Sequence, residues 1–66
     1  MQIRVNGEAR DIDDGLTLAA LLEQLELAGK RIAVERNEAI IPRARHAETV
    51  LEDGDTIEII HAIGGG

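Results

Sequence analysis

The feature that most constrains the fold of this chain is a single leucine stripe in its first half. Thr17 is a suitable N-cap for a helix that follows it. Gly29 is placed to end that helix at the C′ position, with Lys30 near the negative end of the helix dipole. Between them, leucines recur at the i, i+3, i+4 and i+7 spacing of one helix face: Leu18, Leu21, Leu22 and Leu25. The pattern predicts one amphipathic helix over residues 18–27.

The segments on both sides of this helix have strand patterns. Residues 2–6 and 8–12 flank Asn6-Gly7, the dipeptide that best tolerates the two positive φ angles of a type I′ hairpin turn. Pro42 should end an extended piece and lead into irregular structure or a single helical turn, and a tight turn is expected at Asp53-Gly54-Asp55. Further extended segments are predicted at 32–35, 40–41, 49–51 and 56–62. The predicted fold class is therefore α+β, a mixed sheet of four to five strands packed on one main helix.

The composition limits the core that this sheet and helix can enclose. The 66 residues make one small domain, which buries only about 60% of the surface that its unfolded chain exposes. The chain has no aromatic residue and no cysteine, which excludes disulfides, thiolate nucleophiles and Cys-ligated metal sites. A core built from Ile, Leu, Val and Ala alone leaves little room for an internal cleft, which argues against a self-sufficient enzyme.

The net charge of −6 argues against two classes of partner. Thirteen acidic residues against seven basic ones disfavour nucleic acid and anionic membranes, because both bind clustered Lys and Arg. No stretch is long enough to span a bilayer, and the N-terminus alternates instead of showing a signal-peptide pattern. We therefore expect a soluble, cytoplasmic protein.

The charges are also segregated along the chain. Five of the seven basic residues lie between Lys30 and Arg45, whereas the acids from Glu48 to Glu58 have no base among them. This separation suits docking on a basic partner surface, although a solvated acidic turn explains it as well. For Arg45 and Arg43, pairing with the acidic stretch is expected ahead of a partner contact.

A glycine tail follows the last apolar strand directly, as Ile63-Gly64-Gly65-Gly66. Fully extended, these four residues reach about 13 Å, at about 3.3 Å per residue. Because glycine has no side chain, the tail is slim enough to pass through a narrow channel and to present the carboxylate of Gly66 to another protein's active site. A chain end without a function is the alternative.

Two apolar side chains beside the tail are candidates for a docking patch. Ile60 and Ala62 have the opposite parity to Ile57 and Ile59, so they should face away from the helix. Ile63 continues this patch toward the glycines, and exposed apolar side chains in such a place indicate a binding surface. An apolar strand end that its neighbours partly cover is the alternative.

The two histidines, His46 and His61, have neither a metal-site spacing nor a Ser partner. We interpret both as ordinary surface residues, with His61 the one closer to the tail. The chain also lacks the Gly-rich loop with Lys that holds nucleotide phosphates, so neither a cofactor site nor a metal site is predicted in it.

Together these segments resemble the ThiS family, the ubiquitin-like sulfur carriers of thiamine biosynthesis, which have a β-grasp fold. The resemblance covers essentially the whole chain, although the Asp-Gly-Asp turn is shared with the wider sulfur-carrier superfamily. It implies a β-grasp domain over residues 1–63 and a flexible glycine tail over residues 64–66. It rests on the Asn6-Gly7 hairpin, the leucine helix, Val34-Glu35-Arg36-Asn37, Ile41-Pro42-Arg43, Asp53-Gly54-Asp55-Thr56-Ile57-Glu58-Ile59 and the terminal glycines.

The same resemblance implies a protein co-substrate and not an enzyme. An E1-like adenylyltransferase (ThiF-like), using ATP and Mg²⁺, would adenylate the carboxylate of Gly66. A cysteine desulfurase system would then supply the sulfur of a thiocarboxylate, and thiazole synthase (ThiG-like) would accept that sulfur. Gly64 and Gly65 would keep the tail slim, and the chain itself would bind no cofactor.

The alternatives with the same fold stay open at this point. One is the small subunit of molybdopterin synthase, although relatives of that class are usually longer and carry proline or aromatic residues near the tail. Others are a ubiquitin-like modifier, a carrier for tRNA thiolation and an interaction domain with an inert tail. Deleting Gly65 and Gly66 separates the last of these from the rest, because binding alone would survive the deletion.

Overall fold

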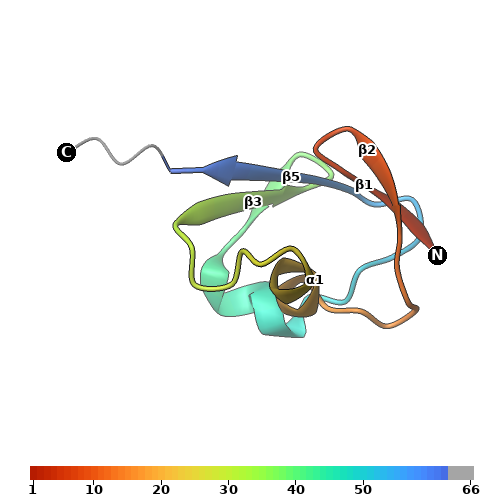
Figure 1. The fold of residues 1–66 in the computed structure, drawn as a ribbon, viewed down its shortest axis with the longest axis horizontal. Helices are drawn as coiled ribbons and strands as arrows, with labels where there is room; N and C mark the ends of the chain where they lie inside the picture. Colours follow the sequence, from red (N-terminus) through yellow and green to blue (C-terminus); the bar gives the residue numbers. More distant parts are fainter. Residues whose placement is uncertain (63–66) are drawn as a thin grey trace.

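The computed structural model describes residues 1–62, which form one layer of sheet and one layer of helix (Figure 1). The strands are β1 (Gln2–Val5), β2 (Glu8–Asp11), β3 (Ile32–Arg36), β4 (Ala39–Ile41) and β5 (Thr56–His61). The helices are α1 (Leu18–Gln24) and the 3-10 helix η1 (Arg43–Glu48). Within the described residues the strands pair in the order β2-β1-β5-β3-β4, and both helices lie on the same face of the sheet.

The sheet is mixed because its central strand, β5, runs parallel to β1 and antiparallel to β3. The predicted opening hairpin is confirmed. Its turn residues, Asn6 and Gly7, have φ angles of 50° and 84°, which are the two positive values of a type I′ turn. The prediction of a mixed sheet packed on one main helix is therefore confirmed as well.

The helix α1 begins where the sequence predicts and ends early. Its N-cap is Thr17, whose hydroxyl accepts a hydrogen bond from the Ala20 N–H at 3.2 Å. The helix then spans only Leu18–Gln24, so the predicted extent of residues 18–27 was wrong at its C-terminal end. The N-cap of α1 is a local interaction that the sequence predicts. The C-terminal end of the helix depends on tertiary packing.

The early end of α1 follows from a reversal at Glu26. This residue has a φ angle of 60°, and the Leu27 N–H donates to the Leu22 carbonyl at 2.8 Å, the pattern of a Schellman motif. The reversal allows Leu27 to pack against the core. Gly29, predicted at the C′ position, lies instead in a separate turn, in which the Lys30 N–H donates to the Leu27 carbonyl at 3.0 Å.

The segment at residues 49–51 is not a strand of the described sheet, contrary to prediction. It makes one isolated bridge, between Val50 and Thr17, and the Leu51 N–H donates to the Leu16 carbonyl at 2.9 Å. These contacts hold the segment at the start of α1, and Leu51 is buried in the core. The helical turn expected after Pro42 is confirmed, and it is the 3-10 helix η1.

The core lies between α1 and the covered face of the sheet. Three leucines of the predicted stripe are buried, whereas Leu25 is only partly buried because it is the C-cap of the shortened helix. The strands contribute from β1, β3 and β5, so the leucine stripe meets the strands as expected. The buried apolar residues are Ile3, Ile12, Leu18, Leu21, Leu22, Val34, Leu51, Ile57 and Ile59.

Candidate functional site at the end of the central strand

The strand β5 leads the chain out of the fold and is held by β3 as far as the described residues go. His61, its last residue, pairs with Ile32, the first residue of β3. The Ala62 N–H then donates to the Arg31 carbonyl at 2.9 Å. The direction in which the chain leaves the fold is therefore fixed by backbone hydrogen bonds up to Ala62.

The residues predicted to react and to form the tail lie outside the described residues. These are Ile63, Gly64, Gly65 and Gly66. The predicted boundary between a domain over 1–63 and a tail over 64–66 falls on the same segment. Their roles stay predictions.

The outward orientation predicted for Ile60 is confirmed. Its side chain is 50% exposed, while Ile57 and Ile59 are buried in the core. Ile60 stands across from Ala33 of β3, on the sheet face that α1 does not cover, and Ala62 is exposed as well. Both predicted docking residues therefore lie at the surface, and their binding to a partner stays a prediction.

A groove of about 400 Å³ runs beside Ile60 and Ala62. Two arginines, Arg31 and Arg43, contribute to its walls together with residues of β3. Sequence reasoning did not name Arg31 as a site residue, because the two arginines meet only after β3 has paired with β5 and η1 has folded. The run of basic residues in the middle of the chain was the signal that could have drawn attention to them.

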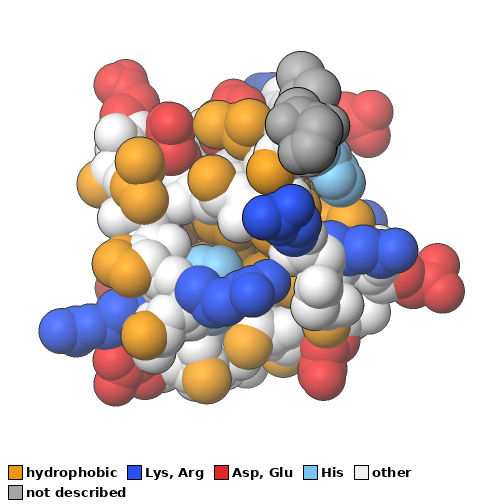
Figure 2. Space-filling model, turned by 90° about the vertical axis from the view of Figure 1, so that its left-hand side faces the viewer, with side chains coloured by type: hydrophobic (Ala, Val, Ile, Leu, Met, Phe, Trp, Pro, Cys, Tyr) orange, Lys and Arg blue, Asp and Glu red, His pale blue; other side chains and the backbone are white. Residues whose placement is uncertain are grey.

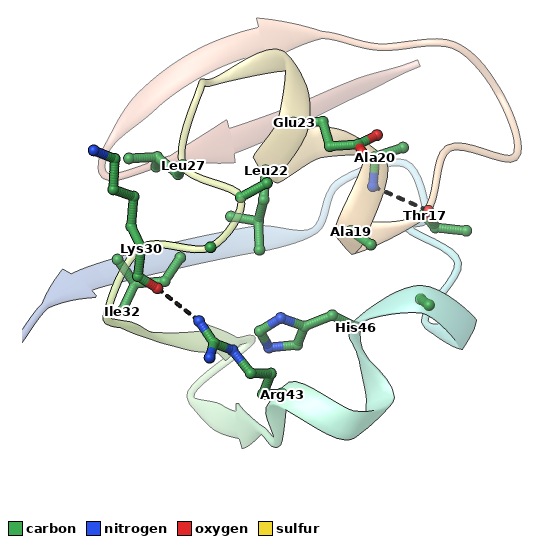
Figure 3. A pocket seen from close by; sticks show the side chains of 13 residues that line it. Thr17, Ala19, Ala20, Leu22, Glu23, Leu27, Lys30, Ile32, Arg43 and His46 are labelled. Atoms are coloured by element: carbon green, nitrogen blue, oxygen red, sulfur yellow. Dashed lines mark hydrogen bonds between the residues drawn. The ribbon is translucent and has the colours of Figure 1, made fainter.

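A second cavity, of about 300 Å³, lies between α1, the loop that follows it and η1 (Figure 3). His46 and Arg43 reach it from η1, and Arg43 also borders the groove beside β5. The Nη2 atom of Arg43 donates to the Lys30 carbonyl at 2.8 Å, the bond drawn between these residues in Figure 3. The groove and the cavity are therefore adjacent, with Arg43 between them.

His46 is buried, which corrects its interpretation as an ordinary surface residue. Its exposed fraction is 8%, and its Nε2 atom lies 3.0 Å from the carbonyl oxygen of Ile41. Because a carbonyl oxygen only accepts hydrogen bonds, Nε2 carries the proton. The sequence did not indicate this burial, since it depends on η1 turning the imidazole toward α1. His61 is exposed, as predicted.

The basic residues after Pro42 differ in their contacts. Arg45 pairs with Glu48 at 3.5 Å, in agreement with the expected pairing to the acidic stretch. The same expectation for Arg43 was wrong within residues 1–62, where its guanidinium donates to a backbone carbonyl and makes no ion pair. The buried residue of the acidic stretch, Asp55, pairs instead with Arg36 of β3, whose Nε lies 2.9 Å from Oδ2 of Asp55.

At the opposite end of β5, the buried carboxylate of Asp55 is the centre of a partly exposed polar network. We call it the Asp55 clasp, formed by Asp55, Arg36, Asn37 and Glu52. The carboxylate accepts hydrogen bonds from Arg36 Nε at 2.9 Å, Asn37 Nδ2 at 3.1 Å and the Glu52 N–H at 2.9 Å. Burial raises the pKa of Asp55. The hydrogen bonds from Glu52 and Asn37 and the charge of Arg36 outweigh this effect, and the pKa lies below its ordinary value.

The Asp55 clasp gives several resemblance motifs a structural role. Arg36 and Asn37 belong to the Val-Glu-Arg-Asn stretch, and Asp55 belongs to the Asp-Gly-Asp turn. Asn6 acts similarly from the hairpin turn, since its Oδ1 accepts a hydrogen bond from the Ile59 N–H at 2.7 Å. These motif residues hold strands together, so they place β5 and do not themselves form the docking patch.

The described part of the chain presents an exposed surface beside the end of β5. Among residues 1–62, no three side chains of His, Asp or Glu gather in a way that could hold a metal ion. In the same part of the chain, no helix has the length and apolar character needed to cross a membrane. Its chemistry is that of exposed apolar and cationic side chains beside the strand that leads toward the glycines.

The chain is similar to known proteins over its whole length. The model of the ThiS family matches residues 3–66. The sulfur carrier protein ThiS of Escherichia coli is 38% identical over 66 residues, and the match covers 100% of both chains. A thiazole synthase of Magnetococcus marinus is 44% identical over 66 residues, but the chain spans only 20% of that protein's length. It spans the same 20% share of a thiazole synthase from Paramagnetospirillum magneticum.

A solved structure confirms the fold. The crystal structure of a thiamine biosynthesis protein, ThiS, from Geobacter metallireducens matches with a TM-score of 0.86 at 32% identity, over 100% of both chains. The β-grasp fold that the resemblance implied is therefore present. Because the family model, a full-length relative and the fold agree, we conclude that the chain belongs to the ThiS family.

Proposed function

We propose that this chain is a sulfur carrier protein for thiazole formation in thiamine biosynthesis, acting as a co-substrate and not as an enzyme. The observation that carries the proposal is the match of the family model through residue 66, which includes the glycine tail. Relatives from Escherichia coli and Bacillus subtilis, 38% and 46% identical, are sulfur carrier proteins by name. The similarity in fold to the ThiS structure from Geobacter metallireducens also supports the proposal.

The reactive group in this proposal is the carboxylate of Gly66. A terminal carboxyl group has an ordinary pKa of roughly 3.5, so it is an anion at neutral pH and a poor electrophile. Reaction with ATP converts it into an acyl-adenylate and releases pyrophosphate. The AMP of the acyl-adenylate is then a good leaving group. Nucleotide and Mg²⁺ are held by the activating enzyme in this scheme, and the chain supplies only the acyl group.

Sulfur then replaces the adenylate. A persulfide from a cysteine desulfurase system forms the carbon–sulfur bond as AMP leaves, and cleavage of the sulfur–sulfur bond by a thiol leaves a thiocarboxylate on Gly66. The thiocarboxylate donates this sulfur to the thiazole ring under construction on thiazole synthase. Because these steps use ATP and thiols, we propose a cytoplasmic location.

The fold supports this role by fixing the base of the tail. The backbone is held to β3 as far as Ala62, and four further extended residues reach about 13 Å, at about 3.3 Å each. In the proposal, Gly64 and Gly65 fit the partner's channel, while Ile60 and Ala62 contact the partner's surface beside it. Ile63 joins these contacts where the tail begins.

The three proposed partners differ in the observations that support them. The thiazole synthases of Magnetococcus and Paramagnetospirillum contain a stretch similar to the whole of this chain within a protein about five times as long. That arrangement supports thiazole synthase as the acceptor. The adenylyltransferase and the desulfurase system are proposed from the chemistry, because a carboxylate needs activation and the chain has no cysteine to hold sulfur.

The intact mass of the chain tests the proposal. The chain is incubated with ATP, Mg²⁺, the cognate adenylyltransferase and a sulfur source, with a Gly66-deleted variant as the matched control. We expect the wild-type mass to rise by the exchange of one oxygen for one sulfur and the control mass to stay constant. An unchanged wild-type mass, with an adenylyltransferase active on another carrier, would contradict the proposal.

A further inference from the structure

The end of the molecule from which β5 leaves is basic, although the chain carries a net charge of −6. Lys30, Arg31 and Arg43 are exposed there, and we call these three residues the basic rim. Figure 2 looks onto this end and shows Lys and Arg side chains among apolar ones, with acidic side chains toward the edges. The charge of this surface is therefore opposite in sign to that of the molecule.

The basic rim is not neutralised within the described part of the chain. Among residues 1–62, the ion pairs shorter than 4.0 Å involve other cations, such as Arg36 with Asp55 and Arg45 with Glu48. A carboxylate of a partner placed among these three cations would be attracted by each of them, because its charge is opposite in sign. The free charge is available for an interaction.

Arg43 is held in place before any partner arrives. Its guanidinium donates to the Lys30 carbonyl at 2.8 Å, which ties η1 to the loop after α1. The same side chain borders both the groove beside Ile60 and the cavity beside His46. A side chain that is already ordered loses less conformational entropy on binding, so Arg43 is suited to anchor a partner.

The cavity next to Arg43 suits an apolar group. Its volume of about 300 Å³ lies within the usual range of ligand pockets. Leu22 and Leu27 line it together with small residues of α1 and η1, among them Ala20 and Ala47, as Figure 3 shows for the labelled members. Small side chains on two facing elements leave room that a large side chain from another protein could fill.

We propose that the basic rim and the adjoining cavity form a second docking surface for the protein that receives the tail. The occupant is a segment of that protein in which an apolar side chain enters the cavity and neighbouring carboxylates pair with Arg31 and Arg43. This inference rests on the proposed function, because it requires a partner that accepts the tail. It extends the contact surface from Ile60 and Ala62 around the end of β3 to η1.

Charge decides between this occupant and other anions. Nucleic acids and anionic membranes present long arrays of negative charge, which the overall charge of −6 repels at distances beyond the rim. A local acidic patch on a protein avoids most of that repulsion. The cavity lining combines leucine and alanine side chains with the carboxylate of Glu23, so it suits a protein side chain better than a phosphate.

The first test compares three charge-matched variants, Arg31→Gln, Arg43→Gln and Arg4→Gln. Arg4 is the control, because it is exposed, donates to a backbone carbonyl as Arg43 does, and pairs with Thr56 at the far end of β5. Binding rates to the cognate adenylyltransferase and to thiazole synthase are measured at low and high ionic strength. With at least one of them, we expect the rim variants to associate about three- to tenfold more slowly at low ionic strength, and Arg4→Gln to match wild type.

The second test fills the cavity. Ala47→Leu adds bulk to the cavity wall, whereas Ala44→Leu adds the same bulk to an exposed position of the same helix, η1, outside the cavity lining. We expect Ala47→Leu to weaken binding to the same partner about tenfold or more, and Ala44→Leu to leave it unchanged. Circular dichroism of both variants checks that η1 and the sheet are retained.

The outcomes separate this inference from the proposed function. Suppose that wild type gains sulfur and binds, but Arg31→Gln and Arg43→Gln associate with both partners as fast as Arg4→Gln does. The second docking surface is then wrong, and the carrier function stands. If wild type neither binds nor gains sulfur, both are wrong. Rim-dependent binding to RNA or to anionic vesicles, with no rim dependence toward either protein, would also overturn the inference.

Discussion

The two ends of β5 are built on opposite principles. At Thr56, where the strand begins, the buried carboxylate of Asp55 accepts three hydrogen bonds, and the one from Arg36 is also an ion pair. At His61, where the strand ends, apolar and cationic side chains lie exposed, and the basic rim has no acidic partner within residues 1–62. One end satisfies its polar groups within the fold, and the other leaves apolar and cationic side chains exposed to solvent.

This difference indicates a division of work along one strand. In a domain with so small a core, hydrogen bonds to the buried carboxylate of Asp55 add to the stability that apolar burial supplies. The cations of the basic rim form no ion pair within residues 1–62, and we propose that a partner binds them. Changes at the first end should therefore affect stability, and changes at the second end should affect partner reactions.

The largest expected effect is the loss of the Asp55 carboxylate. Asp55→Ala leaves Arg36 and two other donors without their acceptor, and we expect a loss of about 3 kcal/mol in the free energy of unfolding. Chemical denaturation measures it, with Asp13→Asn as the control, because Asp13 is exposed and outside the clasp. An unfolding free energy equal to that of wild type would show that the Asp55 clasp does not stabilise the fold.

The next largest effect is expected at Ile60, near the exposed end of β5. Ile60→Glu places a charge on the exposed apolar surface, and we expect the rate of adenylation to fall about tenfold, the equivalent of about 1.4 kcal/mol. The unfolding free energy should change by less than about 0.5 kcal/mol, because the side chain is half exposed. Unchanged adenylation in a folded variant would show that Ile60 is not part of the docking patch.

The pH dependence of stability tests the clasp from another direction. The pKa of Asp55 is lowered in the folded chain, so its contribution is fully present above the ordinary pKa of an aspartate, about 3.9. It is lost as the pH falls through the lowered pKa. We therefore expect the stability difference between wild type and Asp55→Asn to shrink below about pH 4. A difference that is constant from pH 7 down to acid unfolding would contradict the assignment.

The smallest effect lies between the two ends. Glu35 and Glu58 stand directly across from each other on β3 and β5, and like charges in that position are destabilising. Glu58→Gln should raise the unfolding free energy by about 0.2–1 kcal/mol, more at low than at high ionic strength. The same substitution at exposed Glu38, in the turn after β3, is the control.

The parts of the fold that the sequence predicted correctly are those set by local chemistry. Asn6-Gly7 specified the hairpin turn, Thr17 the helix cap, and the alternation in β5 the outward face of Ile60. Each depends on neighbours a few residues apart, so a pattern in the chain is sufficient to reveal it. The surface positions of Ile60 and Ala62 were predicted in this way, and their docking role stays a prediction.

The errors arose where distant segments meet. Glu26 ends α1 because Leu27 returns to the core, and residues 49–51 leave the sheet because they pair with the start of α1. His46 is buried by the turn of η1 toward α1, and Arg31 and Arg43 border the same groove only after β3 and η1 have packed. Such contacts are tertiary, and periodicity within a segment does not report them.

The fate of the sulfur on Gly66 tests the proposed carrier function most directly. The chain is loaded with isotopically labelled sulfur and then mixed, in parallel, with thiazole synthase and its other substrates or with molybdopterin synthase. We expect the label to leave Gly66 and to appear in the thiazole product, with the carrier returned to its original mass. Label that stays on the chain with active thiazole synthase, or that passes only to the molybdopterin product, would contradict the account.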